Sequence, residues 1–377
     1  MRITSRRSAS DAHLGIAVYR EIIDIGNSSQ LVPLIAFHGL AGGDGDRDAG
    51  PARQPGCPDS PGEYFTTHTP VMPREVISIL TPERGGLFVD ATVGMGGHAK
   101  MILEASPQTR LLGIDRDADS LEQARLRLAP FGDRVTLVHD DYRNLPVILE
   151  RHPGNESDEW RGSISGLVAD LGISSYQLAA AGRGFSFQRD EPLDMRMDRS
   201  SGRTAAEIIE EESEGELIRI FREYGEETHA RRIARAIVTR RARSPIATTA
   251  DLAGVVESVV QRRGSRIHPA TRVFQALRIA VNSELEGLEQ FVLDSVEALQ
   301  ARGRLILLSF HSLEDRLIKA SLRKLSHRCS CPRSLPRCAC GSPDLVTLPV
   351  RKLRPDEEEV AANPRSRSAK LRAAERL

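Results

Sequence analysis

The chain after His68 consists of short apolar runs separated by longer amphipathic segments. Five runs predict buried strands: LFVDA (87–91), LLGI (111–114), VTLV (135–138), GLVADL (166–171) and RLILLSF (304–310). The segments between the first four runs are long enough for helices, and SLEQARLRL (120–128) has its apolar residues near helical spacing. Strands that alternate with helices predict a parallel sheet covered on both faces, and therefore an α/β fold.

The alternation stops between residues 185 and 300, where apolar residues follow a helical period. Three stripes show it: Ala230, Ile233, Ala234, Ile237 and Val238; Leu252, Val255, Val256, Val259 and Val260; and Phe274, Leu277, Val281, Leu285 and Leu288. Thr248 and Asp251 have the spacing of a capping box at the start of the second stripe. Strand character returns only at Arg304. We therefore predict a helical domain inserted after the fourth strand of the α/β domain.

These patterns divide the chain into four parts. Residues 1–62 contain the stretch GLAGGDGDRDAGPARQPG, which predicts a disordered or poorly ordered extension, and we assign it no function. Residues 63–182 and 291–377 are expected to form the two parts of the α/β domain. Residues 183–290 are expected to form the inserted helical domain.

Composition and charge are those of a water-soluble globular protein. Hydrophobic residues make up 40% and charged residues 28% of the 377 residues. No apolar run approaches the roughly 20 residues of a membrane-spanning helix, and we expect a cytoplasmic protein without membrane contact. A net charge of zero hides a segregation, because residues 229–272 contain ten Arg against one Asp and one Glu. This segment is suited to phosphates, or it is a solvated helical face.

The stretch VDATVGMGGHAK (89–100) joins a strand to a glycine-rich turn. GMGGHA fits the fingerprint G-x-G-x-x-G/A, with Ala99 last. Asp115 ends the next strand about 20 residues further on, where an acid that binds a ribose is expected. The pattern predicts an adenosine-bearing ligand, which is NAD or S-adenosylmethionine. The alternative is a helix cap with tight packing of helix against sheet.

Polar residues also end the third and fourth predicted strands. The third strand is followed by Asp140, Asp141 and Tyr142. An acid or the aromatic ring there can contact an adenine. The alternative is that an Asp caps a helix and the Tyr ring is half-buried. Asp170 ends the fourth strand. Ligands of open α/β sheets bind beyond the carboxyl ends of the strands, so these acids predict a site at that edge.

Nine segments together resemble the bacterial ribosomal RNA small subunit methyltransferase H family. In chain order they are HTPVMPREVI (68–77), DATVGMGGHA (90–99), GIDRDADSL (113–121), LGISSYQL (171–178), GRGFSFQRDEPLDMRMD (182–198), YGEETHARRIARAIV (224–238), HPATRVFQALRIAVNSELEGLE (268–289), SFHSLEDR (309–316) and NPRSRSAKLR (363–372). The resemblance implies a class I S-adenosylmethionine-dependent methyltransferase (Rossmann-like) fold with an inserted all-helical domain. It also implies N4-methylation of a specific cytidine in the decoding region of small-subunit (16S) ribosomal RNA.

The resemblance further implies which residues contact the cofactor S-adenosylmethionine. They are Gly96, Gly97, His98, Asp115, Tyr142, Asp170 and Gln177. The family usually has Phe in place of Tyr142, and commonly has Pro in place of Tyr176. Ribosomal RNA or the assembled small subunit is the expected partner, and association into a homodimer is left open.

Methylation of a cytosine amine requires an acceptor for one of its hydrogens, because the N4 lone pair is delocalised into the ring. Asp170 or a backbone carbonyl within 170–174 is our candidate catalytic group. The alternative is that Asp170 serves only the amine of the cofactor. The reaction needs no metal.

The target base must leave its stack to be reached. Phe185 and Phe187 are candidates to stack on it, and Arg183, Arg189 and Arg196 to meet phosphates. The alternative is an ordered lid whose Phe side chains plug the core. His311 is a candidate for the base pocket. Ser312 and Asp315 have the spacing of a capping box.

Four cysteines crowd into CSCPRSLPRCAC (329–340), while Cys57 stands apart. Their spacing leaves open a structural zinc site or reduced thiols in a surface loop. Two other functions compete with the methyltransferase. A dehydrogenase accounts for residues 89–115 alone, and a non-catalytic RNA-binding assembly factor accounts for the arginines but not for the acids at the strand ends.

Overall fold

The computed structural model describes residues 70–152, 160–260, 268–327 and 343–377, Cys331, Cys340, and two short strands near the N-terminus. These strands, β1 (Ile22–Ile25) and β2 (Ser28–Leu31), pair antiparallel. They belong to a unit, residues 1–57, that is separate from residues 58–377. The remainder of the predicted N-terminal extension lies outside the described residues, and its disorder stays a prediction.

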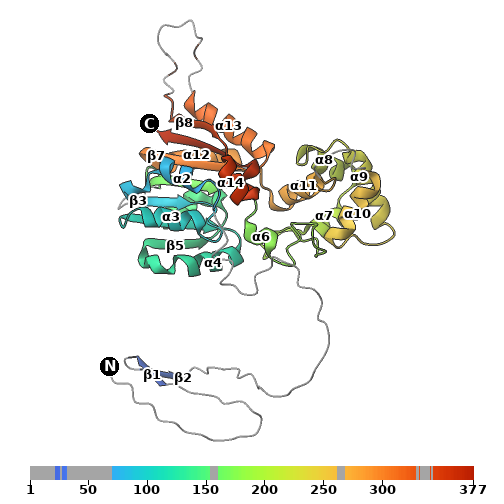
Figure 1. The fold of residues 1–377 in the computed structure, drawn as a ribbon, viewed down its shortest axis with the longest axis horizontal. Coiled ribbons are helices and arrows are strands. Elements are labelled where there is room, and N and C mark those ends of the chain that lie inside the picture. The colour runs from blue at the N-terminus through green and yellow to red at the C-terminus, as the bar shows by residue number, and fades with distance from the viewer. Residues whose placement is uncertain are drawn as a thin grey trace, which may run out of the picture. The chain divides into compact units, whose positions relative to one another are not determined.

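Seven strands form the main sheet (Figure 1). They are β3 (Gly86–Asp90), β4 (Thr109–Asp115), β5 (Val135–His139), β6 (Ile164–Asp170), β7 (Leu299–Ser309), β8 (Val346–Leu353) and β9 (Lys370–Arg376). Their order is β5-β4-β3-β6-β7-β9-β8, with β3 to β7 parallel and β9 antiparallel to both neighbours. All five predicted strands are present, and the predicted α/β fold is confirmed.

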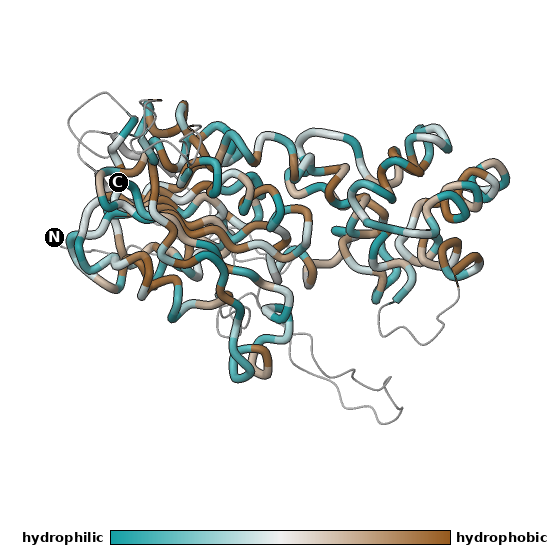
Figure 2. Tube along the Cα trace, turned by 90° about the horizontal axis from the view of Figure 1, so that it is seen from above, coloured by the Kyte–Doolittle hydropathy of each residue, from teal (hydrophilic) through white to brown (hydrophobic). Residues whose placement is uncertain are grey.

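Alternate residues of the strands pack against helices on opposite faces of the sheet. Leu87 and Val89 share a core with α5 (Leu145–Arg151), α12 (Leu288–Ala298) and α13 (Ser312–Ser326). Phe88 points the other way, into a core with α2 (Pro73–Leu80), α3 (Gly97–Ala105) and α4 (Ala118–Leu128). Figure 2 shows mostly hydrophobic strands in the middle of this part, with helices of mixed polarity around them.

Five helices form a helical region with its own apolar core. They are α7 (Ala205–Glu211), α8 (Glu214–Glu223), α9 (Ala230–Arg241), α10 (Thr249–Val259) and α11 (Thr271–Asn282). The first two predicted stripes supply much of that core. The capping box of α10 is confirmed, because Thr248 and Asp251 each accept the other's backbone N–H. We propose residues 183–290 as the extent of this region.

Two local predictions are wrong. The third stripe is not one helix, because α11 ends at Asn282 and Ser283 adopts a left-handed conformation with φ 48°. Leu288 begins α12 and packs under the sheet. The predicted Ser312–Asp315 capping box is also wrong, since His311 is the N-cap of α13 and its side chain accepts the Glu314 N–H.

None of the helices in the described part of the chain is long and apolar enough to span a bilayer.

Candidate functional site

A cavity of about 370 Å³ lies beyond the carboxyl ends of the central strands. The strand order reverses between β3 and β6, which is where open α/β sheets bind ligands. The walls of the cavity come first from the sheet edge: the glycine loop after β3, the ends of β4 and β5, and the segment after β6. The end of α11, the start of α13 and the C-terminal residues Asn363, Arg365 and Ser368 complete them. We call this the main cavity.

The glycine loop is fixed by the acid that ends the neighbouring strand. Gly94, with φ 51°, donates its N–H to Asp115 Oδ2 over 2.8 Å. The other carboxylate oxygen of Asp115 accepts the Asp117 N–H over 2.9 Å. Burial raises the pKa of Asp115 to about 6. A carboxylate has about four acceptor positions, so Asp115 retains capacity for the hydroxyls of a ribose.

The next residues of the loop divide between lining the cavity and packing. Gly97 lines the main cavity, and a Cβ there would lie 3.2 Å from Pro70. His98 also lines it, with Nε2 2.9 Å from the Val71 carbonyl oxygen. Gly96 is not among the lining residues. It caps α3 in a left-handed conformation, and a Cβ there would lie 3.2 Å from Leu128. Its role in this structure is therefore close packing. Gly94, the first glycine of the fingerprint, lines the cavity, although it was not among the predicted cofactor contacts.

Tyr142 lies on the wall beside the end of β5. Its ring contacts Phe291, with centroids 4.5 Å apart and planes at 54°. Burial raises its pKa, so the hydroxyl stays protonated. Asp140 also lines the main cavity. Asp141 does not line it and instead caps the short helix that follows, accepting the Arg143 N–H.

Asp170 ends β6 with an unusual carboxyl group. Its backbone N–H donates to Thr92 Oγ1 over 2.7 Å, but its Oδ1 is buried without a hydrogen-bond partner among the described residues. Burial, reinforced by the charges of Asp90, Glu314 and Glu359, raises its pKa to about 8. A buried carboxylate oxygen without a partner costs free energy, and a cation beside it removes that cost. The site therefore fits a ligand that carries an ammonium group.

Gln177 is held from both ends of its amide. Its Oε1 accepts the Ser174 N–H over 3.0 Å in the capping box of α6 (Ser175–Ala179). Its Nε2 donates to Asp117 Oδ2 over 2.7 Å. Tyr176 in the position of the usual proline is compatible with this geometry. Gln177 lines the main cavity beside Asp170.

The two phenylalanines predicted to stack on the target base pack against side chains of the helical region. Phe185 is buried in the core of the helical region. Phe187 stacks on His268 with centroids 4.5 Å apart and meets Phe274 edge-on at 5.0 Å. Neither lines the main cavity. The burial of Phe185 favours the alternative of a plug in the core, whereas stacking of Phe187 on the target base stays a prediction.

The predicted phosphate-binding arginines are also engaged within the protein. Arg183 is buried, with Nη2 2.9 Å from Asp117 Oδ2. Arg189 is partly exposed, lies 3.2 Å from Glu191 and donates to the Leu178 carbonyl. Arg196 pairs with Asp194 at 2.7 Å. None of the three lines the main cavity.

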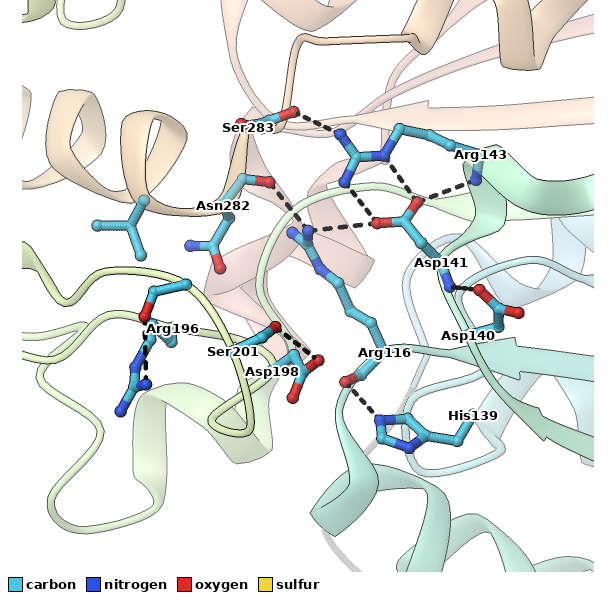
Figure 3. Close-up of a pocket in the computed structure, with 12 residues that line it drawn as sticks. Arg116, His139, Asp140, Asp141, Arg143, Arg196, Asp198, Ser201, Asn282 and Ser283 are labelled. Carbon is cyan, nitrogen blue, oxygen red and sulfur yellow. Dashed lines mark hydrogen bonds and ion pairs between the residues drawn. The ribbon is translucent and has the colours of Figure 1, made fainter.

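A second pocket of about 410 Å³ adjoins the ends of β4 and β5 (Figure 3). Arg116 and Asp140 line both cavities. Arg116 Nη1 donates to the Asn282 carbonyl over 2.9 Å and lies 3.6 Å from Asp141 Oδ2. Figure 3 shows Arg116 reaching from the end of β4 towards the end of α11. Sequence reasoning missed this residue, although it directly follows Asp115.

Among the lining residues of the main cavity that were not predicted are Arg278, Glu284 and Glu314. Their signal is position, since all three fall in the segments HPATRVFQALRIAVNSELEGLE and SFHSLEDR. His311, which was predicted, does not line the cavity but lies 3.1 Å from Glu314 Oε1.

The cysteine cluster falls largely outside the description. Cys329 and Cys338 lie outside the described residues. The choice between zinc and reduced thiols therefore stays a prediction.

Comparison with known proteins identifies relatives along most of the chain. Two curated relatives are both named ribosomal RNA small subunit methyltransferase H. The one from Syntrophotalea carbinolica is 52% identical over 314 residues, covering 82% of this chain and 98% of its own length. The one from Geotalea uraniireducens is 49% identical over 314 residues, and the match again covers 82% of this chain and 98% of the relative.

Solved structures are more distant. A SAM-dependent O-methyltransferase from Thermotoga maritima is 12% identical, with a TM-score of 0.36 over 84% of this chain and 69% of that one. An rRNA methylase from Streptococcus thermophilus is 11% identical, with a TM-score of 0.33 over 80% of this chain and 95% of that one.

The model of the MraW methylase family matches residues 65–377. Because this match spans most of the chain and the curated relatives are about half identical to it, the chain belongs to the MraW methylase family.

Proposed function

We propose that the protein transfers a methyl group from S-adenosylmethionine to the exocyclic N4 of one cytidine in the decoding region of small-subunit ribosomal RNA. The name shared by the curated relatives supports the RNA substrate. The observation that carries the proposal is the buried, unpartnered Oδ1 atom of Asp170 in the main cavity. Membership of a methylase family removes the dehydrogenase alternative.

S-adenosylmethionine is the cofactor of this methylase, and it supplies a methyl group on an electrophilic sulfonium. Asp115 is suited to the ribose, and Tyr142 with Asp140 to the adenine. Asp170 is suited to the ammonium group of the methionine part, with Gln177 beside it. The orphaned Asp170 Oδ1 supports this fit, because a bound ammonium gives the buried oxygen its missing partner.

The proposal assigns Asp170 to the cofactor rather than to the target amine. A carboxyl group whose pKa is about 8 is mostly protonated at neutral pH and is then a poor hydrogen-bond acceptor. The Asp170 carboxyl group becomes a carboxylate when a cation lies beside it, and the carboxylate then binds that cation rather than the target amine. The acceptor for the target amine must therefore come from another residue of the cavity.

The wider contact with RNA is assigned to the basic face of α9. Ile233 and Ile237 bury one face of this helix, while Arg231, Arg232 and Arg235 are exposed. Exposed arginines neutralise phosphates and release counterions, which favours binding without reading sequence. The target base must then leave its stack to enter the cavity. We expect this chemistry in the cytoplasm, on free ribosomal RNA or on the assembled subunit.

Methyl-labelled S-adenosylmethionine, the purified protein and unmodified small subunits test the proposal. The RNA is digested to nucleosides after the reaction. Label in N4-methylcytidine is the expected result. Label in another nucleoside overturns the proposed acceptor. Binding of the RNA without any label transfer supports a non-catalytic assembly factor instead.

A further inference from the structure

Four polar side chains gather on one wall of the main cavity without a part in the function proposed so far. Arg278 and Glu284 come from α11 and the turn after it, and His311 and Glu314 come from the start of α13. The exposed fractions are only 2% for Glu314, 6% for Glu284 and 9% for His311. Arg278, Glu284 and Glu314 line the cavity, whereas His311 lies behind them.

The two carboxylates of this cluster have different partners. Arg278 donates from Nε and Nη2 to the two oxygens of Glu284, both over 2.9 Å. This bidentate pair occupies Glu284 and neutralises it. Glu314 Oε2 accepts the Phe310 N–H over 3.1 Å, and Oε1 lies 3.1 Å from His311 Nε2. A carboxylate has about four acceptor positions, so Glu314 keeps acceptor capacity towards the cavity.

The protonation of His311 follows from its role as a helix cap. Its Nδ1 accepts the Glu314 backbone N–H over 3.4 Å, so the neutral ring carries its proton on Nε2. Nε2 is buried without a hydrogen-bond partner among the described residues, although it lies 3.1 Å from Glu314 Oε1 and 4.0 Å from Glu284 Oε2. His311 therefore lies against the Glu314 carboxylate and does not line the cavity.

Glu314 is held as a carboxylate although it is buried. Burial alone raises its pKa, but His311, Arg278 and the Phe310 N–H outweigh that effect and hold the pKa below its usual value. Its charge in turn contributes to the raised pKa of Asp170, which lines the same cavity. The cavity thus contains one carboxyl group that lacks a cation and one that is kept charged.

A metal ion is a poorer occupant of this cluster than an organic donor. Glu284, His311 and Glu314 do place three ligand atoms within 4.8 Å of one another. However, Arg278 already occupies both oxygens of Glu284 with a positive charge, and the His311 nitrogen that faces the carboxylates carries a proton. A neutral N–H donor can bind the free acceptor positions of Glu314 without displacing Arg278 or the His311 proton.

We infer that Glu314 accepts a hydrogen from the exocyclic amine of the target base and thereby selects cytosine against uracil. The inference rests on the proposed function and names the catalytic acceptor of that site. Cytosine presents an N4 amine, whereas uracil presents the O4 oxygen, and a carboxylate repels an oxygen acceptor. As the new C–N bond forms and the C–S bond breaks, the electron pair stays on sulfur. The N4 proton passes to Glu314 and then to solvent.

The variant Glu314→Gln tests this role, because its amide has the same shape but presents N–H donors. We expect methyl transfer to unmodified small subunits to fall about 10²- to 10⁴-fold, the range for loss of a general base. The affinity for S-adenosylmethionine, measured by calorimetry, should not fall, since Asp170 and Asp115 are intact and loss of the Glu314 charge lowers the pKa of Asp170. The matched control is Glu289→Gln, an exposed acid on α12 that pairs with Lys324.

Binding of the RNA gives a second readout that does not depend on turnover. The wild-type protein should prefer subunits with cytidine at the target position over subunits with uridine by about tenfold. Glu314→Gln should lose this binding preference. Glu314→Asp keeps the charge, so it should retain the preference while its methyl transfer is slower than that of the wild type.

The outcomes separate the inference from the proposed function. Unchanged transfer and unchanged preference in a folded Glu314→Gln variant overturn the inference alone, provided that the wild type forms N4-methylcytidine. If Glu314→Gln does not fold, loss of the preference in Glu314→Asp overturns it. Absence of N4-methylcytidine with the wild type overturns both.

Discussion

Arg183 and Asp117 form a buried ion pair, with Nη2 and Oδ2 2.9 Å apart, between the segment after α6 and the start of α4. Arg183 also donates to the Met197 carbonyl over 3.0 Å. The same Asp117 oxygen accepts the Gln177 amide, so one carboxylate joins the cavity wall to the helical region and to the sheet. The shape of the cofactor site therefore depends on a residue that does not line it.

Replacing Arg183 by Ala should lower the free energy of unfolding by about 3–5 kcal/mol, because it leaves the Asp117 charge buried without its partner. Denaturant unfolding measures this. The control Arg189→Ala removes a partly exposed arginine and should change the free energy by less than about 0.5 kcal/mol. Equal effects of the two substitutions would contradict the structural role of the buried pair.

Replacing Asp170 by Asn should weaken S-adenosylmethionine binding by roughly 10- to 100-fold, the worth of one hydrogen bond to a charged group. Isothermal calorimetry with the isolated protein measures the affinity. Asp133→Asn, at an exposed acid in the turn before β5, is the matched control and should leave it unchanged. A wild-type affinity in Asp170→Asn would remove the assignment of this carboxyl group to the cofactor.

Cofactor binding should also depend on pH through Asp170. Its pKa of about 8 in the empty protein means that the group is protonated at pH 7, whereas a bound ammonium requires the carboxylate. Affinity should therefore rise as the pH rises towards 8 and level off above it, with a proton released on binding at pH 7. Calorimetry in buffers of different ionisation enthalpy counts the proton. Asp170→Asn should release fewer protons than the wild type, and an identical count in both would refute this linkage.

The basic face of α9 should govern the salt dependence of binding to small subunits. Replacing Arg231, Arg232 and Arg235 together by Ala should lower the slope of log affinity against log salt by about 2 if all three meet phosphates. Arg125→Ala, at an exposed arginine of α4, serves as the control. A slope that the triple variant leaves unchanged would assign the RNA contact to another surface.

The sequence predicted the five parallel strands because their apolar runs are buried on both faces. It did not reveal β8, whose apolar run is broken by Pro349, or β9, whose pattern is mostly polar. In β9 the buried positions include Arg372, and this arginine is tolerated there because it pairs with Asp315 of α13 at 2.7 Å. Such a partner lies far away in the sequence, so local patterning cannot anticipate it.

The candidate site shows the same division. The acids at the strand ends were predictable because parallel strands bring their carboxyl ends to one edge. Phe185 was misassigned because an aromatic residue among arginines is typical both of an RNA-binding loop and of a plug in a second core. Glu314 lies in a segment that the resemblance identified, but it was missed because only the tertiary structure brings α11 and α13 together beside the cavity.

The central claim is tested most directly by locating the methyl group on the RNA. Unmodified small subunits are treated with the protein and S-adenosylmethionine, and the ribonuclease fragments of their RNA are analysed by mass spectrometry. The account predicts one added methyl group, on a cytidine of a decoding-region fragment. A methyl group found only outside the decoding region, or on a base other than cytosine, would contradict it.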